Sequence, residues 1–228
     1  MTLVVGDIHA CYQEFQDLLD RAGIGADDEV LAVGDILDRG PDNRQVLDFF
    51  RCRPRAASIL GNHERKHLRS ARGEIEPAPS QVITRSQLGD GYPDCLAYLA
   101  TLARHRQPPG ALVVHAFWEP GVPLEEQRDT VLIGTLSGEH YLTKRHAQPW
   151  YELYDGPQPL IVGHRDYRGD GEPLVWRDRV YCLDTGCCHG GRLTGLVLPQ
   201  FRFVSVPARA DHWQQTQQAF ADRLDPDL

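Results

Sequence analysis

The sequence predicts an α/β fold, and three observations carry this prediction. Short apolar runs alternate with amphipathic segments over the first 60 residues, in the order strand, helix, strand, helix, strand. Such an order is typical of a parallel sheet with helices on its faces. From residue 160 onward the chain becomes a series of short apolar strands with brief connections, which is typical of antiparallel pairs. Polar residues follow the early apolar runs, so we expect a site at the carboxyl ends of the strands.

Each early element has its own local signal. The expected strands are 3–5, 30–33 and 56–60, and the expected helices are 12–22 and 43–51. The first helix places Phe15, Leu18 and Leu19 on one face. Gly23 follows its last turn and ends it. Pro41 lies near the start of the second helix, where a missing N–H costs little.

The alternation of expected strands and helices stops in the middle of the chain. Residues 74–80 have the composition of a loop, 94–104 have a helical pattern, and 117–145 look irregular, as part of a rim around the site. The later strands are expected at 160–162, 174–176, 180–183, 193–198 and 201–206, in a second, mixed sheet, with a terminal helix over 212–224. We expect one domain over residues 1–228, with an insertion or cap around 70–110.

Composition excludes several classes of function. The chain has 24 Lys+Arg against 32 Asp+Glu and a formal net charge of −8, so we expect no binding of nucleic acid through its overall field. We expect no membrane partner, because no apolar run is long enough to span one. The chain enters a strand at once, so we expect a cytoplasmic location. None of the six cysteines forms a Cys-x-x-Cys pair, which favours reduced thiols over a zinc motif.

Three motifs carry most of the chemistry. They are GDIHA (6–10), GDILDRG (34–40) and GNHE (61–64), and each follows an expected strand. Two further histidines follow later apolar runs. The candidate metal ligands are Asp7, His9, Asp35, Asn62, His115 and His164. Such O and N donors suit Mn, which we expect, and also Fe, Zn, Ni or Mg. Six donors suffice for two ions that share one carboxylate, and ions about 3.5–4 Å apart are used to hydrolyse phosphate esters.

The remaining motif residues suggest an acid and a phosphate contact. Asp35 comes from a strand end between the other donors, so it is the natural bridging carboxylate. His63 adjoins the ligand Asn62 and is better placed as a general acid than as a ligand. Asp38 could orient the His63 ring, and the Arg39 guanidinium matches phosphate oxygens. Each motif alone could be a turn or a loop ion pair, but the whole set in this order is not explained by chance.

These motifs resemble the calcineurin-like metallophosphoesterase superfamily, in its phosphoprotein-phosphatase branch. The later strings 161–165 and 183–194 are similar to bacterial members of that branch: serine/threonine phosphatases, the phosphatase module of polynucleotide kinase-phosphatases, and symmetrical diadenosine tetraphosphatases. The similarity covers residues 3–72 and 111–206. It implies a four-layer sandwich of two mixed β-sheets flanked by helices.

The resemblance also implies roles for individual residues. One metal would be held by Asp7, His9 and Asp35, and the other by Asp35, Asn62, His115 and His164. His63 and Asp38 would form the acid pair, with Arg39 on the phosphate.

The sequence departs from the family's pattern at three positions. Ala10 stands where the family usually has Gly, Phe117 where a small Gly is common, and Arg165 where Thr is common. Arg165 could add a phosphate contact, so it is a candidate substrate-binding residue. For Phe117 and Trp118 we favour ordinary packing over stacking on a base. For the basic run 65–72 we favour a solvated helix face over attraction of an anionic substrate.

The sequence therefore predicts a dinuclear-metal phosphoesterase that acts on phosphate monoesters, with a phosphoprotein as one candidate. An alternative is a nucleotide-directed hydrolase acting on diadenosine tetraphosphate or a nucleic-acid end phosphate. An alternative of another class is a metal-binding scaffold without turnover. The presence of His63, Asp38 and Arg39 argues against the scaffold, because binding alone needs no acid pair. The expected partner is a phosphorylated small molecule, phosphoprotein or nucleotide.

Overall fold

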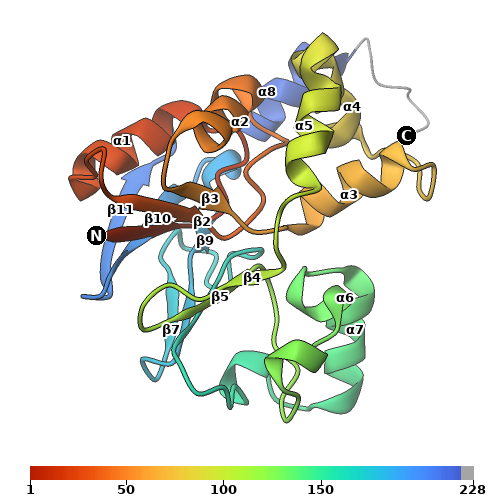
Figure 1. Ribbon diagram of the computed structural model, residues 1–228. Coiled ribbons are helices and arrows are strands. Elements are labelled where there is room, and N and C mark those ends of the chain that lie inside the picture. Colours follow the sequence, from red (N-terminus) through yellow and green to blue (C-terminus); the bar gives the residue numbers. More distant parts are fainter. Residues whose placement is uncertain (222–228) are drawn as a thin grey trace.

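The computed structural model describes residues 1–221, and it has two β-sheets packed face to face with helices on their outer faces (Figure 1). The first sheet contains β1 (Thr2–Val5), β2 (Glu29–Ala32), β3 (Ala56–Ser58), β10 (Arg192–Leu198) and β11 (Arg202–Pro207), with β9 (Asp184–Thr185) paired to β10. The second sheet contains β4 (His105–Arg106), β5 (Leu112–Val114), β6 (Leu160–Val162), β7 (Leu174–Trp176) and β8 (Val180–Cys182). The predicted four-layer α/β sandwich is confirmed.

Both sheets are mixed. In the order β11-β10-β1-β2-β3, strands β1, β2 and β3 are parallel, and β10 is antiparallel to β1 and β11. In the order β4-β5-β6-β8-β7, strands β5, β6 and β8 are parallel, and the edge strands β4 and β7 are antiparallel to their neighbours. The expectation that the strands at 193–198 and 201–206 join the second sheet is wrong. They complete the first sheet, where β10 supplies the hydrogen-bond partners that β1 needs on its other side.

The helices lie in two outer layers. They are α1 (Tyr12–Ala22), α2 (Asn43–Cys52), α3 (Asn62–Ala71), α4 (Pro79–Leu88), α5 (Tyr92–Leu99), α6 (Asp129–Leu132), α7 (Leu136–Arg145) and α8 (His212–Ala219). Short 3-10 turns lie at Gly89–Gly91, Leu124–Glu126, Trp150–Glu152 and Cys187–His189. Figure 1 shows α1, α2 and α8 over the first sheet, with α6 and α7 on the side of the second.

Alternation along the strands explains the layers. In β1, Leu3 and Val5 pack against the helices, while Val4 packs between the sheets. In β6 the pattern is the same: Ile161 lies between the sheets, while its neighbours face the second helical layer. Successive side chains of a strand point to opposite faces, so a strand that is apolar at every position must be covered on both.

Several element boundaries differ from the prediction. Part of the expected loop over 74–80 opens α4, which starts with Pro79 at its first turn. The helix expected at 94–104 is α5, which begins at Tyr92 and ends at Leu99. The stretch 117–145 contains α6 and α7. Helix α6 has only 4 residues and α7 has few apolar residues, so neither shows a clear helical period of apolar side chains. The terminal helix expected over 212–224 is α8, and residues 222–224 lie outside the described part of the chain.

Within residues 1–221, no helix combines the length and the apolar character that crossing a membrane requires.

Candidate active site

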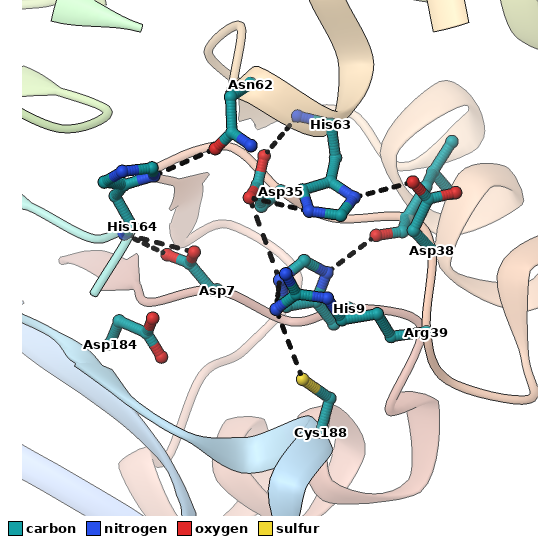
Figure 2. A network of polar contacts seen from close by, with 12 residues as sticks. Asp7, His9, Asp35, Asp38, Arg39, Asn62, His63, His164, Asp184 and Cys188 are labelled. Carbon is teal, nitrogen blue, oxygen red and sulfur yellow. Dashed lines mark hydrogen bonds and ion pairs between the residues drawn. The ribbon is translucent and has the colours of Figure 1, made fainter. Parts of the chain in front are cut away.

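The six predicted metal ligands lie together at one edge of the two sheets, and Figure 2 labels five of them. Each lies shortly after one of the strands β1, β2, β3, β5 and β6, and Asn62 is the first residue of α3. The six are Asp7, His9, Asp35, Asn62, His115 and His164. Carboxyl ends of neighbouring parallel strands meet at one edge, which is why residues up to 157 positions apart in the chain come into contact.

Asp35 lies between two groups of donor atoms. Its Oδ2 is 3.7 Å from His9 Nε2, and its Oδ1 is 3.5 Å from His115 Nε2. Asp35 belongs to two sets of candidate ligands, and within each set the ligand atoms lie within 4.8 Å of one another. The first set is Asp35 with His9 and His63, and the second is Asp35 with His115 and His164. A single carboxylate therefore faces both halves of the site, as a bridging ligand would.

Backbone carbonyls fix the orientation of two histidines among the candidate ligands. His9 Nδ1 lies 2.9 Å from the Leu37 carbonyl oxygen, and His115 Nδ1 lies 2.8 Å from that of Val33. A ring that donates its Nδ1–H to a carbonyl turns the Nε2 lone pair toward the site. This is the usual support for a histidine that binds a metal.

Around Asn62, His115 and His164, hydrogen-bond acceptor atoms face one another. Asn62 Oδ1 lies 3.0 Å from His115 Nε2 and 2.9 Å from His164 Nδ1. In a neutral His115 that donates from Nδ1, the Nε2 is an acceptor, so it repels the amide oxygen unless a cation or a proton lies between them. Burial opposes the charged His115 ring, but Asp35 outweighs it and raises the pKa of His115 to about 10. A divalent cation would replace that proton.

Two carboxylates, those of Asp7 and Asp184, lie close together in the part of the site that contains Asp7. The Asp7 carboxylate accepts the His164 backbone N–H at 3.0 and 3.1 Å. Burial, and next the neighbouring Asp184 carboxylate, raise the pKa of Asp7 well above its usual value. Two close carboxylates in a buried site need positive charge nearby. The donor set and its charge thus fit divalent metal ions.

Sequence reasoning did not assign Asp184 to the site. It lies beside Asp7 in Figure 2, on β9 directly after β8. A signal was available, because Asp184 follows an apolar strand as Asp7 does.

His63 is held by Asp38 at the edge of the metal-ligand cluster. Its Nδ1 lies 2.6 Å from Asp38 Oδ2, and its Nε2 lies 4.0 Å from Asp35 Oδ2. The bond to Asp38 therefore fixes the ring with Nε2 directed toward the donors that surround Asp35 (Figure 2). This geometry suits a proton donor, since the free ring nitrogen faces the place where a substrate would bind.

Asp38 is fully buried in a dense hydrogen-bond network. Besides His63, it accepts from His67 Nε2 at 2.8 Å, Thr84 Oγ1 at 2.6 Å and Ser80 Oγ at 3.2 Å. Gln81 Nε2 also donates to Asp38 Oδ2. Burial acts to raise the pKa of Asp38, but His67 and then His63 outweigh it and hold that pKa well below its usual value.

These partners of Asp38 were missed in the sequence. The prediction of a solvated basic face is wrong for His67, whose side chain is fully buried. The spacing of His63 and His67, one helical turn apart, is the signal that could have found it. Ser80 and Thr84 are on α4, in the segment expected to be a cap, and their hydroxyl groups donate hydrogen bonds to the Asp38 carboxylate.

Glu64 holds the two metal-binding loops together. Its buried carboxylate accepts backbone N–H groups of Asp35 at 2.8 Å, Ile36 at 3.0 Å and Gly61 at 3.0 Å. These bonds stabilise a strained loop, because Asp35 has a φ of 48° and Asp38 a φ of 72°. The glutamate of the GNHE motif is thus a structural support.

The turn after β1 also has left-handed backbone. Ala10 has a φ of 55° and is fully buried. This conformation favours glycine, which gives a physical reason for the glycine that is usual at this position in the family.

The two predicted phosphate-binding arginines differ in position. Arg39 is partly buried, with Nη1 3.2 Å from His9 Nε2 and 3.8 Å from Cys188 Sγ, so its guanidinium lies against the donor cluster (Figure 2). The side chain of Arg165 is 53% exposed and pairs with Glu139. Arg165 thus lies at the rim, beside the ligand His164.

Two cavities adjoin the site. The first, here called the basic cavity, has a volume of about 440 Å³ and is lined by Asn62, His164, Arg65, Lys66 and Arg69, among others. Three members of the basic run 65–72 are partly exposed and line a cavity that reaches two metal-ligand candidates. The basic cavity is therefore suited to an anionic group that extends away from the metal-ligand candidates.

The second cavity, here called the aromatic cavity, has a volume of about 430 Å³. Its lining includes Phe117, Trp150, Tyr151, Tyr167 and Arg165. The Phe117 ring is 5.1 Å from the His164 ring and only 2% of the residue is exposed, so it packs as predicted and also forms the wall nearest the site.

Comparison with known proteins identifies the family of this chain. Residues 1–165 match the model of the calcineurin-like phosphoesterase family. A bis(5'-nucleosyl)-tetraphosphatase PrpE [asymmetrical] of Anoxybacillus flavithermus is 30% identical, over 90% of this chain and 93% of the relative. A symmetrical bis(5'-nucleosyl)-tetraphosphatase of Coxiella burnetii is 25% identical, over 92% of each chain. A crystal structure of a protein provisionally assigned as a diadenosine tetraphosphatase superposes with a TM-score of 0.72 at 28% identity, over 91% of this chain and 93% of that one.

Proposed function

This chain belongs to the calcineurin-like phosphoesterase family and is a metal-dependent hydrolase of phosphoric esters, and on that premise we propose that its substrate is a dinucleoside tetraphosphate. The basic cavity carries this proposal. A phosphate monoester needs only the metal ions and Arg39, whereas a chain of four phosphates extends beyond them. Arg65 and Lys66 offer positive charge along that path, while Arg69, which also lines it, pairs with Glu74.

The relatives favour the nucleotide alternative over the first expectation of a phosphate monoester such as a phosphoprotein. Both curated relatives named above are bis(5'-nucleosyl)-tetraphosphatases, one asymmetrical and one symmetrical. The aromatic cavity supports the same choice, because tyrosine and tryptophan rings beside the site offer stacking surfaces to a nucleobase. The proposal therefore replaces the phosphoprotein with the nucleotide.

The metal ligands divide into two sets in this proposal. Asp7, His9 and Asp35 would hold one ion, and Asp35, Asn62, His115 and His164 would hold the other. Two divalent ions, with Mn expected, supply Lewis-acid polarisation of the phosphate and a nucleophile at neutral pH when bound.

The other groups bind substrate and move a proton. The Arg39 guanidinium contacts the oxygens of the phosphate under attack, since it lies beside His9 with donors facing the site. His63 donates a proton from Nε2 to the leaving oxygen, and Asp38 holds Nδ1 so that the ring keeps this direction. The buried network around Asp38 preorganises this pair.

Neutralising the basic cavity tests the proposed substrate. We expect Arg65→Ala and Lys66→Ala to raise KM for diadenosine tetraphosphate by about tenfold each, because a charge-assisted contact contributes about 1.4 kcal/mol or more. The KM for p-nitrophenyl phosphate should change little, since that substrate ends near the metal ligands. Arg72→Ala is the matched control, because Arg72 follows the same helix but does not line the basic cavity. Equal effects on both substrates would contradict the assignment of the cavity to the phosphate chain.

Arg165 provides a second, independent test at the rim. We expect Arg165→Thr to raise KM more for diadenosine tetraphosphate than for p-nitrophenyl phosphate, by up to about fivefold, since an exposed charge contributes about 1 kcal/mol or less. Steady-state kinetics on both substrates measure this. Arg168→Thr is the control, because Arg168 is similarly exposed but pairs with Asp170 outside both cavities. An unchanged ratio of the two KM values would leave Arg165 without a role in binding.

A further inference from the structure

A second cluster of side chains of metal-binding type lies next to the turn that carries His9. Cys11 directly precedes α1, Glu14 is in the first turn of α1, and His212 is the first residue of α8. One ligand atom from each lies within 4.8 Å of the other two. Cys11 and Glu14 are almost fully buried, and the His212 side chain is 12% exposed. The three atoms are one sulfur, one oxygen and one nitrogen.

The Glu14 carboxylate is only half satisfied. Its Oε1 lies 2.7 Å from His212 Nε2 and accepts the Arg209 backbone N–H at 2.8 Å. Its Oε2 is buried and has no hydrogen-bond partner among the described residues. The Arg209 guanidinium does not supply one, because it pairs with Asp17 at 2.6 Å. An unpartnered buried carboxylate oxygen is costly, and a cation would remove that cost.

We propose that Cys11, Glu14 and His212 bind a zinc ion at a site separate from the active site. Zinc prefers four ligands drawn from Cys sulfur, His nitrogen and carboxylate oxygen, which is the set present here. Three ligands come from these side chains, and a water molecule would take the fourth position. On binding, the Cys11 sulfur enters as the thiolate and its proton leaves to solvent.

The ligands also distinguish this site from the active site. The active-site donors are carboxylates, imidazoles and an amide oxygen, which suit Mn, whereas a thiolate selects zinc or another soft ion. The two sites therefore need not compete for one metal.

The position of the cluster gives the ion a structural role. Cys11 Sγ lies 3.5 Å from the carbonyl oxygen of His9, so the cluster is attached to the turn that carries a candidate active-site ligand. His212 attaches α8 to the same point. A bound ion would fasten the C-terminal helix to α1 and to the strained turn after β1.

This cluster also explains why cysteine spacing pointed to reduced thiols. Its ligands come from residues 11–14 and from residue 212, nearly 200 positions apart. Zinc motifs are recognised from short, fixed spacings, so a site assembled from both ends of the chain leaves no such pattern.

Cobalt(II) is the most direct probe, because only a thiolate ligand gives an intense sulfur-to-cobalt charge-transfer band in the near ultraviolet. The full-length protein would be stripped with a chelator and reloaded with cobalt while absorbance is recorded. We expect the wild type to show this band, and we expect Cys11→Ser to lose it. His212→Gln should weaken cobalt binding at this site by at least roughly 10- to 100-fold, because loss of a direct ligand costs no less than loss of a group that only orients one. The proposed active-site ligands contain no sulfur, so an ion bound by them would not give this band.

Cys182→Ser is the matched control, because Cys182 is equally buried but packs in the second sheet. It should keep the band. A wild-type protein that takes up cobalt without the band would overturn the proposal, and so would a Cys11→Ser protein that keeps it. A wild-type spectrum without the band overturns the proposal even if a variant fails to fold. Its outcome does not depend on hydrolytic activity, so it is separate from the proposed function.

Discussion

Replacing Asp35 with Asn is expected to remove both manganese ions from the active site and to slow hydrolysis by roughly a thousand-fold. The reason is that Asp35 faces both groups of donors, with Oδ1 toward His115 and Oδ2 toward His9. An amide keeps the shape but loses the shared negative charge. A metal centre supplies several kcal/mol of transition-state stabilisation, and about 4 kcal/mol corresponds to roughly a thousand-fold in rate.

Manganese content and kcat/KM would be measured on the same preparation. Asp27→Asn is the control, since it makes the same chemical change at an exposed position away from the site. Circular dichroism would show that the Asp35 variant is folded. A variant that retains two manganese ions, or one that works at the wild-type rate, would show that Asp35 is not the bridge.

Replacing His63 with Ala is expected to leave both manganese ions bound while slowing the reaction selectively. The loss should be roughly 100- to 10,000-fold for an alkyl phosphate, whose leaving oxygen must be protonated. It should be much smaller for p-nitrophenyl phosphate, because that leaving group departs with little proton transfer. This contrast follows from the geometry, in which Asp38 holds His63 Nδ1 at 2.6 Å and leaves Nε2 toward the site.

Two variants sharpen this test. Asp38→Asn should show a weaker version of the same contrast, since it disturbs the direction of the ring but not the ring itself. His140→Ala is the control, because His140 is exposed on α7. Loss of manganese in the His63 variant would make His63 a ligand. An equal slowing on both substrates would indicate electrostatic stabilisation of the transition state, and the role of proton donor would then be wrong.

The sequence predicted the metal-ligand candidates because their positions follow from local rules. Asp7, Asp35 and Asn62 each come directly after a short apolar run, and parallel strands bring such positions to one edge. The order of these runs also predicted the first three strands of the first sheet. These inferences need only neighbours in the chain.

What the sequence did not reveal depends on contacts between distant segments. Ser80 and Thr84 hold Asp38 from α4, a helix whose inward face carries polar side chains, and this weakens the apolar period by which buried helices are recognised. The pairing of β10 with β1 was missed for a related reason. A strand that is apolar on both faces fits either sheet, and only the open edge of β1 decides between them.

We propose that two divalent ions and the basic cavity act together on a dinucleoside tetraphosphate. The most direct measurement is a manganese titration of chelator-treated enzyme, with kcat/KM determined for diadenosine tetraphosphate, a phosphopeptide and a 3′-phosphorylated oligonucleotide. We predict that activity returns as two manganese ions bind per chain and that diadenosine tetraphosphate has the highest kcat/KM of the three. Full activity with one ion per chain, or a higher kcat/KM for the phosphopeptide or the oligonucleotide, would contradict this account.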